Sequence, residues 1–196
     1  MAKLDSSLKN MVLSLGIISL IASAVLAGGY TLTKEPIQKA QMKKQQDAIE
    51  EVLPIKDAKV GEKVEIKLDG KTDAFFIYPA EKDGKLVGAA IQTYSYDGYA
   101  GKIEVMVGLD NEGIVSNYTI LAASETPGLG SKITDWFKTS KANQDIRGKN
   151  LSQTKLAVKK DGGEIDAITA STISSRAFLS SINSAFEAFK KYQQQN

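Results

Sequence analysis

The chain begins with a long apolar stretch and then changes to mixed polar sequence. Between Met11 and Tyr30 no side chain is charged, and most are apolar. A helix needs about 20 such residues to cross a bilayer. The pattern therefore predicts a transmembrane helix over 11–30, preceded by a cytoplasmic N-terminal segment over 1–10.

A cleaved signal peptide would produce a similar start. Lys3 and Lys9 form a basic beginning, and Ala22-Ser23-Ala24 resembles a small-residue cleavage site. The apolar run continues beyond that site, which favours a retained anchor. Cations usually mark the cytoplasmic side of a span. The lysines after this span outnumber the two before it: Lys34, Lys39, Lys43 and Lys44. The side of the membrane on which the domain lies therefore stays open at this point.

The segment after the apolar stretch is polar and favours a helix. Residues Glu35 to Leu53 are rich in Gln, Lys, Glu and Ala, with few apolar positions. We interpret 31–54 as a helical stalk or linker that ends at Pro54, with its charged residues as a solvated surface. The remaining residues, 55–196, then form one globular domain.

Within that domain, short runs rich in β-branched and aromatic residues alternate with turn sequences. Asp83-Gly84 and Asn111-Glu112-Gly113 separate neighbouring runs, so an antiparallel meander is the simplest topology. We expect strands at 74–78, 86–94, 102–109 and 114–121, a helix near 131–139, and a further strand near 155–158.

Apolar residues at helical spacing predict a final helix. Ile182, Ala185, Phe186 and Phe189 form one stripe, which we expect to pack on the sheet as core. The predicted fold class is therefore α+β: an N-terminal transmembrane helix, followed by one domain with an antiparallel sheet and packed helices.

Composition narrows the chemistry of the chain. Its 196 residues include no Cys and no His, which excludes thiolate and imidazole metal sites, iron–sulfur ligation and His-based acid–base catalysis. The net charge is only +2, so no strong field exists to attract nucleic acid. We expect no metal site, no catalytic residue and no nucleic-acid partner, and any redox chemistry requires an organic cofactor.

Hydroxyl side chains cluster just before the final helix, in Asp166-Ala167-Ile168-Thr169-Ala170-Ser171-Thr172-Ile173-Ser174-Ser175. Such a segment commonly supplies a helix N-cap. It also suits an anion, because the unpaired N–H groups and positive dipole end of a helix start stabilise phosphate. The residues by themselves leave both interpretations open.

A second segment, Ser124-Glu125-Thr126-Pro127-Gly128-Leu129-Gly130, has the chemistry of a tight turn. Adjacent Pro and Gly suit the two central positions of a type II turn, and Gly130 adds a second point of backbone freedom. By itself, this segment predicts only a turn.

Together, the two segments resemble the hallmark motifs of FMN-binding domains, in the order that family has them. In the family, the last Thr of an Asp-x-x-(Ser/Thr)-Gly-Ala-Thr motif carries FMN through a phosphoester, and that position is Thr172 here. Ala170 and Ser171 stand where Gly and Ala are usual. A third segment, Asp97 to Val105, is similar to the family's Gly-Tyr-x-Gly sequence.

This resemblance implies covalent FMN on Thr172 and further contacts with the cofactor from nearby residues. The implied contacts are Thr169, Ser171 and Ser174 beside the attachment point, and Glu125, Thr126, Gly128 and Leu129 in the turn. Leu129 and Trp136 are candidates to cover a face of the flavin ring, with core packing as the alternative for Trp136.

Nearly the whole chain, anchor included, is similar to the G subunits of Rnf-type electron-transport complexes. The resemblance implies an electron-transfer subunit, not catalytic alone, in a complex that links ferredoxin and NAD chemistry to Na+ or H+ transport. The implied partners are the other membrane subunits and a flavin transferase. The implied location is the cytoplasmic (inner) membrane, with one span and the flavin domain outside. The alternatives are the related C subunit of Na+-translocating NADH:quinone reductase, and an anchored scaffold domain without redox function.

Overall fold

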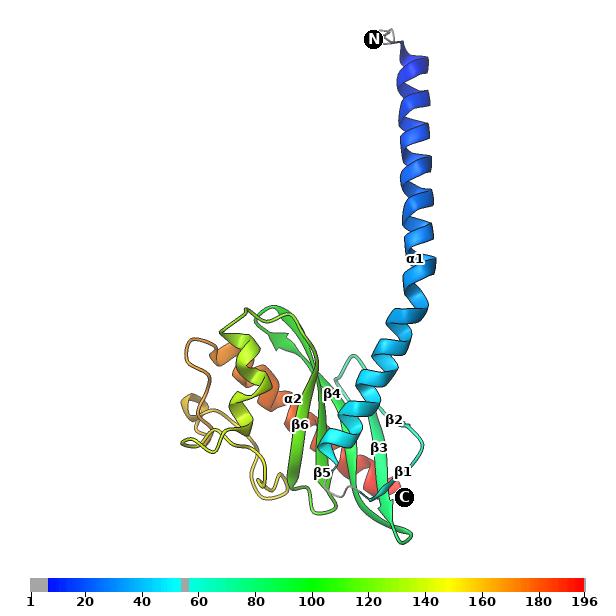
Figure 1. The fold of residues 1–196 in the computed structure, drawn as a ribbon. Coiled ribbons are helices and arrows are strands. Elements are labelled where there is room, and N and C mark those ends of the chain that lie inside the picture. The colour runs from blue at the N-terminus through cyan, green and yellow to red at the C-terminus, as the bar shows by residue number, and fades with distance from the viewer. Residues whose placement is uncertain (1–6, 54–56, 196) are drawn as a thin grey trace. The chain divides into compact units, whose positions relative to one another are not determined.

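The computed structural model describes residues 7–53 and 57–195, which form two compact units that divide between Lys44 and Gln45. One helix, α1 (Leu8–Val52), continues from the first unit into the second (Figure 1). The predicted transmembrane segment and the predicted stalk therefore belong to a single helix. The predicted end of the stalk at Pro54, the start of the domain at 55 and residues 1–6 lie outside the described residues.

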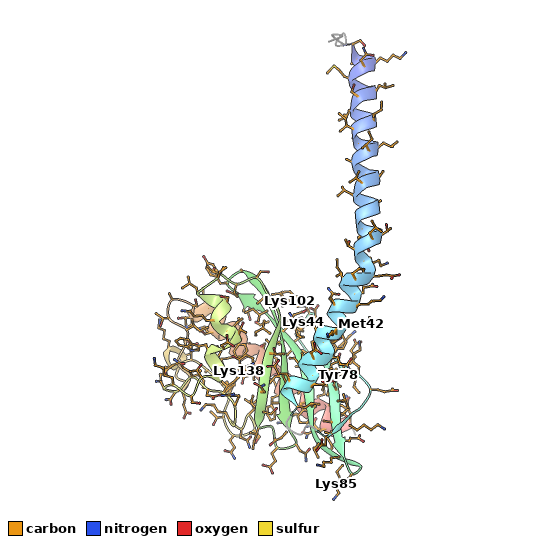
Figure 2. All side chains as sticks on the ribbon, viewed as in Figure 1. Met42, Lys44, Tyr78, Lys85, Lys102 and Lys138 are labelled. Carbon is orange, nitrogen blue, oxygen red and sulfur yellow. The ribbon has the colours of Figure 1, made fainter. Side chains whose placement is uncertain are left out.

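In the described residues, the first unit is α1 as far as Lys44, and it contains the apolar stretch 11–30. Its side chains project outward all around the helix, and almost all of them are exposed (Figure 2). Its most apolar 18-residue window has a mean hydropathy of 2.3. Within the described ranges, α1 is the one helix long and apolar enough to cross a membrane. A helix that is apolar on every side is suited to contact with lipid.

An antiparallel six-stranded sheet forms the centre of the second unit. β3 to β6 are neighbours in space in the same order as in the sequence, and β1 and β2 both pair with β3. The predicted meander and the α+β fold class are confirmed. The two short first strands were not predicted, since runs of two or three residues carry no periodic pattern. The strands are β1 (Lys59–Val60), β2 (Val64–Ile66), β3 (Phe75–Lys82), β4 (Lys85–Gly98), β5 (Gly101–Asp110) and β6 (Val115–Ala123).

Turn residues join these strands as the sequence indicates. β3 and β4 meet through Asp83 and Gly84, whose φ angles of 53° and 73° are those of a two-residue type I′ hairpin. Between β5 and β6, the Asp110 carboxylate accepts the N–H groups of Glu112 and Ile114 at 2.9 and 2.8 Å. The residues within each connection therefore determine the conformation of its turn.

The helix α2 (Thr172–Gln195) covers one face of the sheet and forms the main core with it. Thr93 of β4 donates a buried hydrogen bond to the Ser181 carbonyl at 2.7 Å. The predicted apolar stripe is confirmed as core, although Phe186 is only half-buried. Alternate residues of β5 belong to this core and are fully buried: Ile103, Val105, Val107 and Leu109.

The last two turns of α1 cover the opposite face of the sheet. The sheet residues in this contact alternate with those that face α2, as the pleat of a strand requires. The predicted solvated stalk therefore ends in a buried helical segment that belongs to the compact second unit. The small second cluster consists of Ala48, Ile49 and Val52 from α1 with Tyr78, Ala90 and Met106 from the strands.

Polar groups of β6 hold the end of α1 in place. The carbonyls of Val52 and Glu51 accept hydrogen bonds from Ser116 Oγ at 2.5 Å and Asn117 Nδ2 at 3.2 Å. Carbonyls in the last turn of a helix have no intrahelical partner, so these bonds satisfy them. Gly108 lies beneath this contact, and a Cβ there would collide with the Val52 carbonyl.

The region predicted as a helix over 131–139 consists of two short 3₁₀ helices, η1 (Gly130–Thr134) and η2 (Trp136–Lys138). Their backbone N–H groups bond to carbonyls three residues earlier, as 3₁₀ geometry requires. Ile133 and Phe137 are fully buried, so packing of these two side chains decides the local shape.

The strand predicted near 155–158 is wrong: within the described part of the chain, Val158 forms only an isolated bridge to Ile165. A third 3₁₀ helix, η3 (Lys159–Asp161), follows at once. The physical reason is a side chain, since Asn183 of α2 bonds both backbone groups of Leu156 at 3.0 and 2.8 Å. An amide from the helix thus takes the place of a neighbouring strand.

Candidate functional site

A cleft of about 490 Å³ opens where α2 begins. Three segments line it: the loop between β4 and β5, the turn after β6, and the start of α2 with the residues before it. The two motifs, far apart in the sequence, therefore meet in one hollow. The lining residues are Tyr99, Glu125, Thr126, Leu129, Gly130, Ala170, Ser171, Thr172, Ile173 and Ser174.

The start of α2 is held by a small set of buried hydrogen bonds. Ser171 precedes the helix, and its carbonyl accepts the backbone N–H of Ser175 at 3.0 Å and the hydroxyl of Ser175 at 2.9 Å. The Ser175 hydroxyl accepts the N–H of Ile168 at 3.0 Å. Thr172, the first helical residue, lines the cleft. Ser175 therefore fixes the segment in place, while Thr172 is presented to the cleft.

Ala170 has a backbone conformation that is unusual for its residue type. Its φ angle is 61°, in the left-handed region that glycine adopts without steric cost. This is the position at which the sequence motif usually has glycine. The chain therefore retains the turn before Ser171 with an alanine in a strained conformation.

Asp166 fastens the beginning of the same segment. Its carboxylate accepts the N–H of Asn143 at 3.1 Å and pairs with Lys159 Nζ at 2.7 Å. The Lys159 ammonium, together with that N–H, holds the pKa of the Asp166 carboxyl below its ordinary value. The Asp166 carbonyl accepts the indole N–H of Trp136 at 2.9 Å. Trp136 thus packs against the core and does not line the cleft.

The opposite wall is a type II turn. The Thr126 carbonyl accepts the N–H of Leu129 at 3.2 Å, and Gly128 has a φ angle of 75°, which the third position of such a turn requires. The Gly128 N–H donates to Ser131 Oγ at 3.0 Å. The predicted turn is confirmed. Gly130 has no positive φ, and its role is close packing: a Cβ there would lie 2.6 Å from Ser174 Oγ.

The rim of the cleft is apolar and open to solvent. Tyr99, Leu129 and Ile173 are 70%, 41% and 50% exposed, and each comes from a different one of the three lining segments. Single exposed apolar residues are ordinary, but three that converge on one cleft mark a binding surface. The cleft therefore combines a hydroxyl-rich helix start with an apolar rim.

Comparison with known proteins identifies the family. The chain is 33% identical over 192 residues to the G subunit of the ion-translocating oxidoreductase complex of Vibrio cholerae, covering 93% of this chain and 90% of that protein. The chain belongs to this family of G subunits. A further relative, the G subunit of the Na(+)-translocating ferredoxin:NAD(+) oxidoreductase complex of Acetobacterium woodii, is 32% identical over 92% of both chains. The corresponding G subunit of Haemophilus influenzae is 36% identical over 84% of this chain and 82% of its own length.

The FMN-binding domain family matches residues 98–187. That range contains all ten residues that line the cleft, from Tyr99 to Ser174. The family of G subunits and the FMN-binding domain thus agree with the resemblance carried by the two motifs. The names of these relatives favour the G subunit of the ion-translocating complex over the quinone-reductase C subunit.

The cleft brings together six of the eight predicted site residues: Glu125, Thr126, Leu129, Ser171, Thr172 and Ser174. Gly128 and Thr169 do not line it. Gly128 shapes the turn, and Thr169 lies before the helix. The predicted set omitted four lining residues: Tyr99, Gly130, Ala170 and Ile173. The sequence signal for Tyr99 is its place in the Gly-Tyr-x-Gly segment. Ile173 has no comparable signal, because its 50% exposure is known only from the structure.

Proposed function

We propose that this chain is the membrane-anchored flavoprotein subunit of an ion-translocating oxidoreductase complex, with FMN joined through its phosphate to Thr172. The observation that supports the proposal best is the cleft itself. It joins a helix start, an exposed apolar rim and both FMN-domain motifs in one volume of about 490 Å³, within the range of ordinary cofactor sites.

The helix start fits the phosphate end of the cofactor. Thr172 is the first residue of α2, where unpaired N–H groups and the helix dipole favour negative charge. The first turn of α2 contains no acidic residue to oppose that charge. A phosphodiester there retains one negative charge, which the dipole would stabilise by about 0.3–1 kcal/mol.

The apolar rim fits the ring end. Leu129 and Ile173 offer aliphatic surface and Tyr99 an aromatic face, and the turn places backbone groups and Thr126 beside them. Bound FMN would supply one-electron acceptance and donation, whereas the residues of the chain hold it, orient it and limit the access of water. Thr172 is thus an attachment point and not a catalytic nucleophile.

The anchor and the domain then have separate roles. We propose that α1 crosses the inner membrane once through residues 11–30, with the flavin domain on the extracytoplasmic side and the complex's other subunits around the span. Covalent attachment suits that side, because no pool of free FMN is expected there to replace lost cofactor.

The orientation of the domain can be tested with protease. Protease added outside spheroplasts should digest the domain, and protection until the membrane is lysed would reverse the orientation.

The central experiment is Thr172→Ala in the full chain, produced together with a flavin transferase. Intact mass should show one FMN on the wild type and none on the variant, while the unfolding midpoint moves little. A missing hydroxyl at a helix start costs at most about 0.5–2 kcal/mol. Thr169→Val is the matched control, because Thr169 lies outside the cleft. Flavin retained on Thr172→Ala would place the ester elsewhere.

A second experiment separates the ring end from the phosphate end. Thr126→Val removes a hydroxyl from the cleft, and Gly128→Val imposes a side chain on a φ angle of 75°. Both variants should keep flavin on Thr172 but change its absorption spectrum or potential. Unchanged spectra and potentials in both fully loaded variants would make the turn purely structural.

A further inference from the structure

Glu125 is the one charged residue that lines the cleft, and it is buried. The residue is only 6% exposed. A Cβ on Gly98 would lie 2.7 Å from Oε1, and Gly130 packs in the same way against Oε2. Two glycines from different segments therefore make the space that the carboxylate occupies.

Each carboxylate oxygen accepts a hydrogen bond from a different segment. Oε1 accepts the N–H of Ala100 at 3.3 Å, from the loop between β4 and β5. Oε2 accepts the hydroxyl of Ser174 at 2.6 Å, from the first turn of α2. Glu125 itself directly precedes the turn that forms the third wall. One side chain thus ties together all three segments of the cleft.

We propose that Glu125 is a positioning residue, which holds the three walls in the geometry that the cofactor requires and makes no bond to the flavin. Through Ser174 it fixes the helical turn that carries Thr172. Through Ala100 it fixes the loop that carries Tyr99. The identity of the ligand in this inference rests on the proposed function, but the network of contacts does not.

Side-chain chemistry provides a set of matched variants. In Glu125→Gln, the amide oxygen accepts the Ala100 N–H and the amide NH₂ donates to the Ser174 hydroxyl, which can also accept. This variant keeps both links and removes the charge. Glu125→Ala removes both links, and Glu125→Asp is one methylene too short to keep both. Ser174→Ala removes a single link.

The experiment uses the full chain in detergent, with and without the flavin transferase. Hydrogen–deuterium exchange is followed in peptides that contain Ala100 and Ser174, flavin loading by intact mass, and the bound flavin by its absorption spectrum. Glu125→Gln should match the wild type in all three. Glu125→Ala and Glu125→Asp should exchange about tenfold faster or more at these peptides, as expected for loss of a bond to a charged acceptor, and should load less flavin. Ser174→Ala should be intermediate.

Two results would overturn the inference. If Glu125→Gln loads flavin but shifts its spectrum as strongly as Glu125→Ala does, the carboxylate charge acts on the flavin directly. If Glu125→Ala exchanges and loads like the wild type, the carboxylate positions nothing. A wild type that takes up no flavin beside an active transferase would instead refute the proposed function, while exchange in the flavin-free chain would still decide whether Glu125 holds the walls together.

Discussion

Each face of the sheet is covered by a helix, but the two helices have different roles. On one face, α2 buries a long apolar stripe and begins at the cleft. On the other, only the last two turns of α1 make contact, through a small cluster and two capped carbonyls. The helix that begins at the cleft and the docked end of α1 thus use separate faces of one sheet. Damage to the α1 face should therefore lower stability without removing flavin, whereas loss of the Thr172 hydroxyl in the cleft should remove flavin with little effect on stability.

The largest effect should come from removal of the docked part of α1. We expect a chain that begins at Gln45 to fold stably, and a chain of residues 55–196 to lose about 4–6 kcal/mol, because it no longer buries Ile49 and Val52. Urea denaturation of the two chains measures the difference. Equal midpoints would mean that residues 45–52 are only a spacer.

A point substitution under the same contact should cost somewhat less. Gly108→Val would place methyl groups against the Val52 carbonyl and Ser116 Oγ, and we expect a loss of about 3 kcal/mol. Ser116→Ala is the matched control, since it removes only the hydrogen bond, worth about 1 kcal/mol. Both variants should load flavin normally once folded. Flavin loss in folded Gly108→Val would show that the two faces are coupled.

On the cleft face, Ala170→Gly should raise the free energy of unfolding by about 1 kcal/mol, because glycine relieves the left-handed conformation. Ala142→Gly is a good comparison, since Ala142 has a φ angle of 53° outside the cleft. We expect similar stabilisation from both, and a change in the rate of flavin attachment only from Ala170→Gly. A destabilised Ala170→Gly chain would contradict the assigned strain.

The smallest effect should be a response of the attachment segment to acid. Because the Lys159 ion pair lowers the pKa of Asp166 in the folded chain, its stabilisation is present above the ordinary value of 3.8 and is lost as pH falls through the lowered pKa. The single tryptophan bonds to the Asp166 carbonyl, so its fluorescence reports this change. Asp166→Asn should remove the acid step in the fluorescence. An identical step in the variant would assign it to another carboxylate.

Periodic features of the sequence predicted most of the fold. The meander followed from strand runs and turn residues, and the α2 stripe from helical spacing. The sequence could not show that the strand predicted near 155–158 is wrong. The backbone groups of Leu156 bond to Asn183 of a distant helix instead of to a neighbouring strand, and only the fold brings the two residues together. The docking of α1 was missed for a similar reason: Ile49 and Val52 are apolar in the sequence, but only the fold shows which face they cover.

The site was predicted from sequence motifs, and most of the predicted residues line the cleft. What they could not supply was the role of close approaches between distant segments. Gly98 and Gly130 are simply glycines in the sequence, and their proximity to Glu125 exists only after three segments have converged. Tyr99 and Ile173 were missed because an exposed apolar residue is unremarkable until others gather beside it.

The way the two helices are attached also has a consequence for the order of folding. Each strand from β3 to β6 pairs with its neighbour along the chain, so the meander can close through short loops at little entropic cost. By contrast, the bond from Ser116 to Val52 joins residues 64 apart, and the bond from Thr93 to Ser181 joins residues 88 apart. Contacts of such long sequence separation form late. The chain should therefore assemble from its middle outward, and the cleft, whose walls include the start of α2, should be among the last features to mature. The flavin attachment that we propose would then be a chemical record of completed folding.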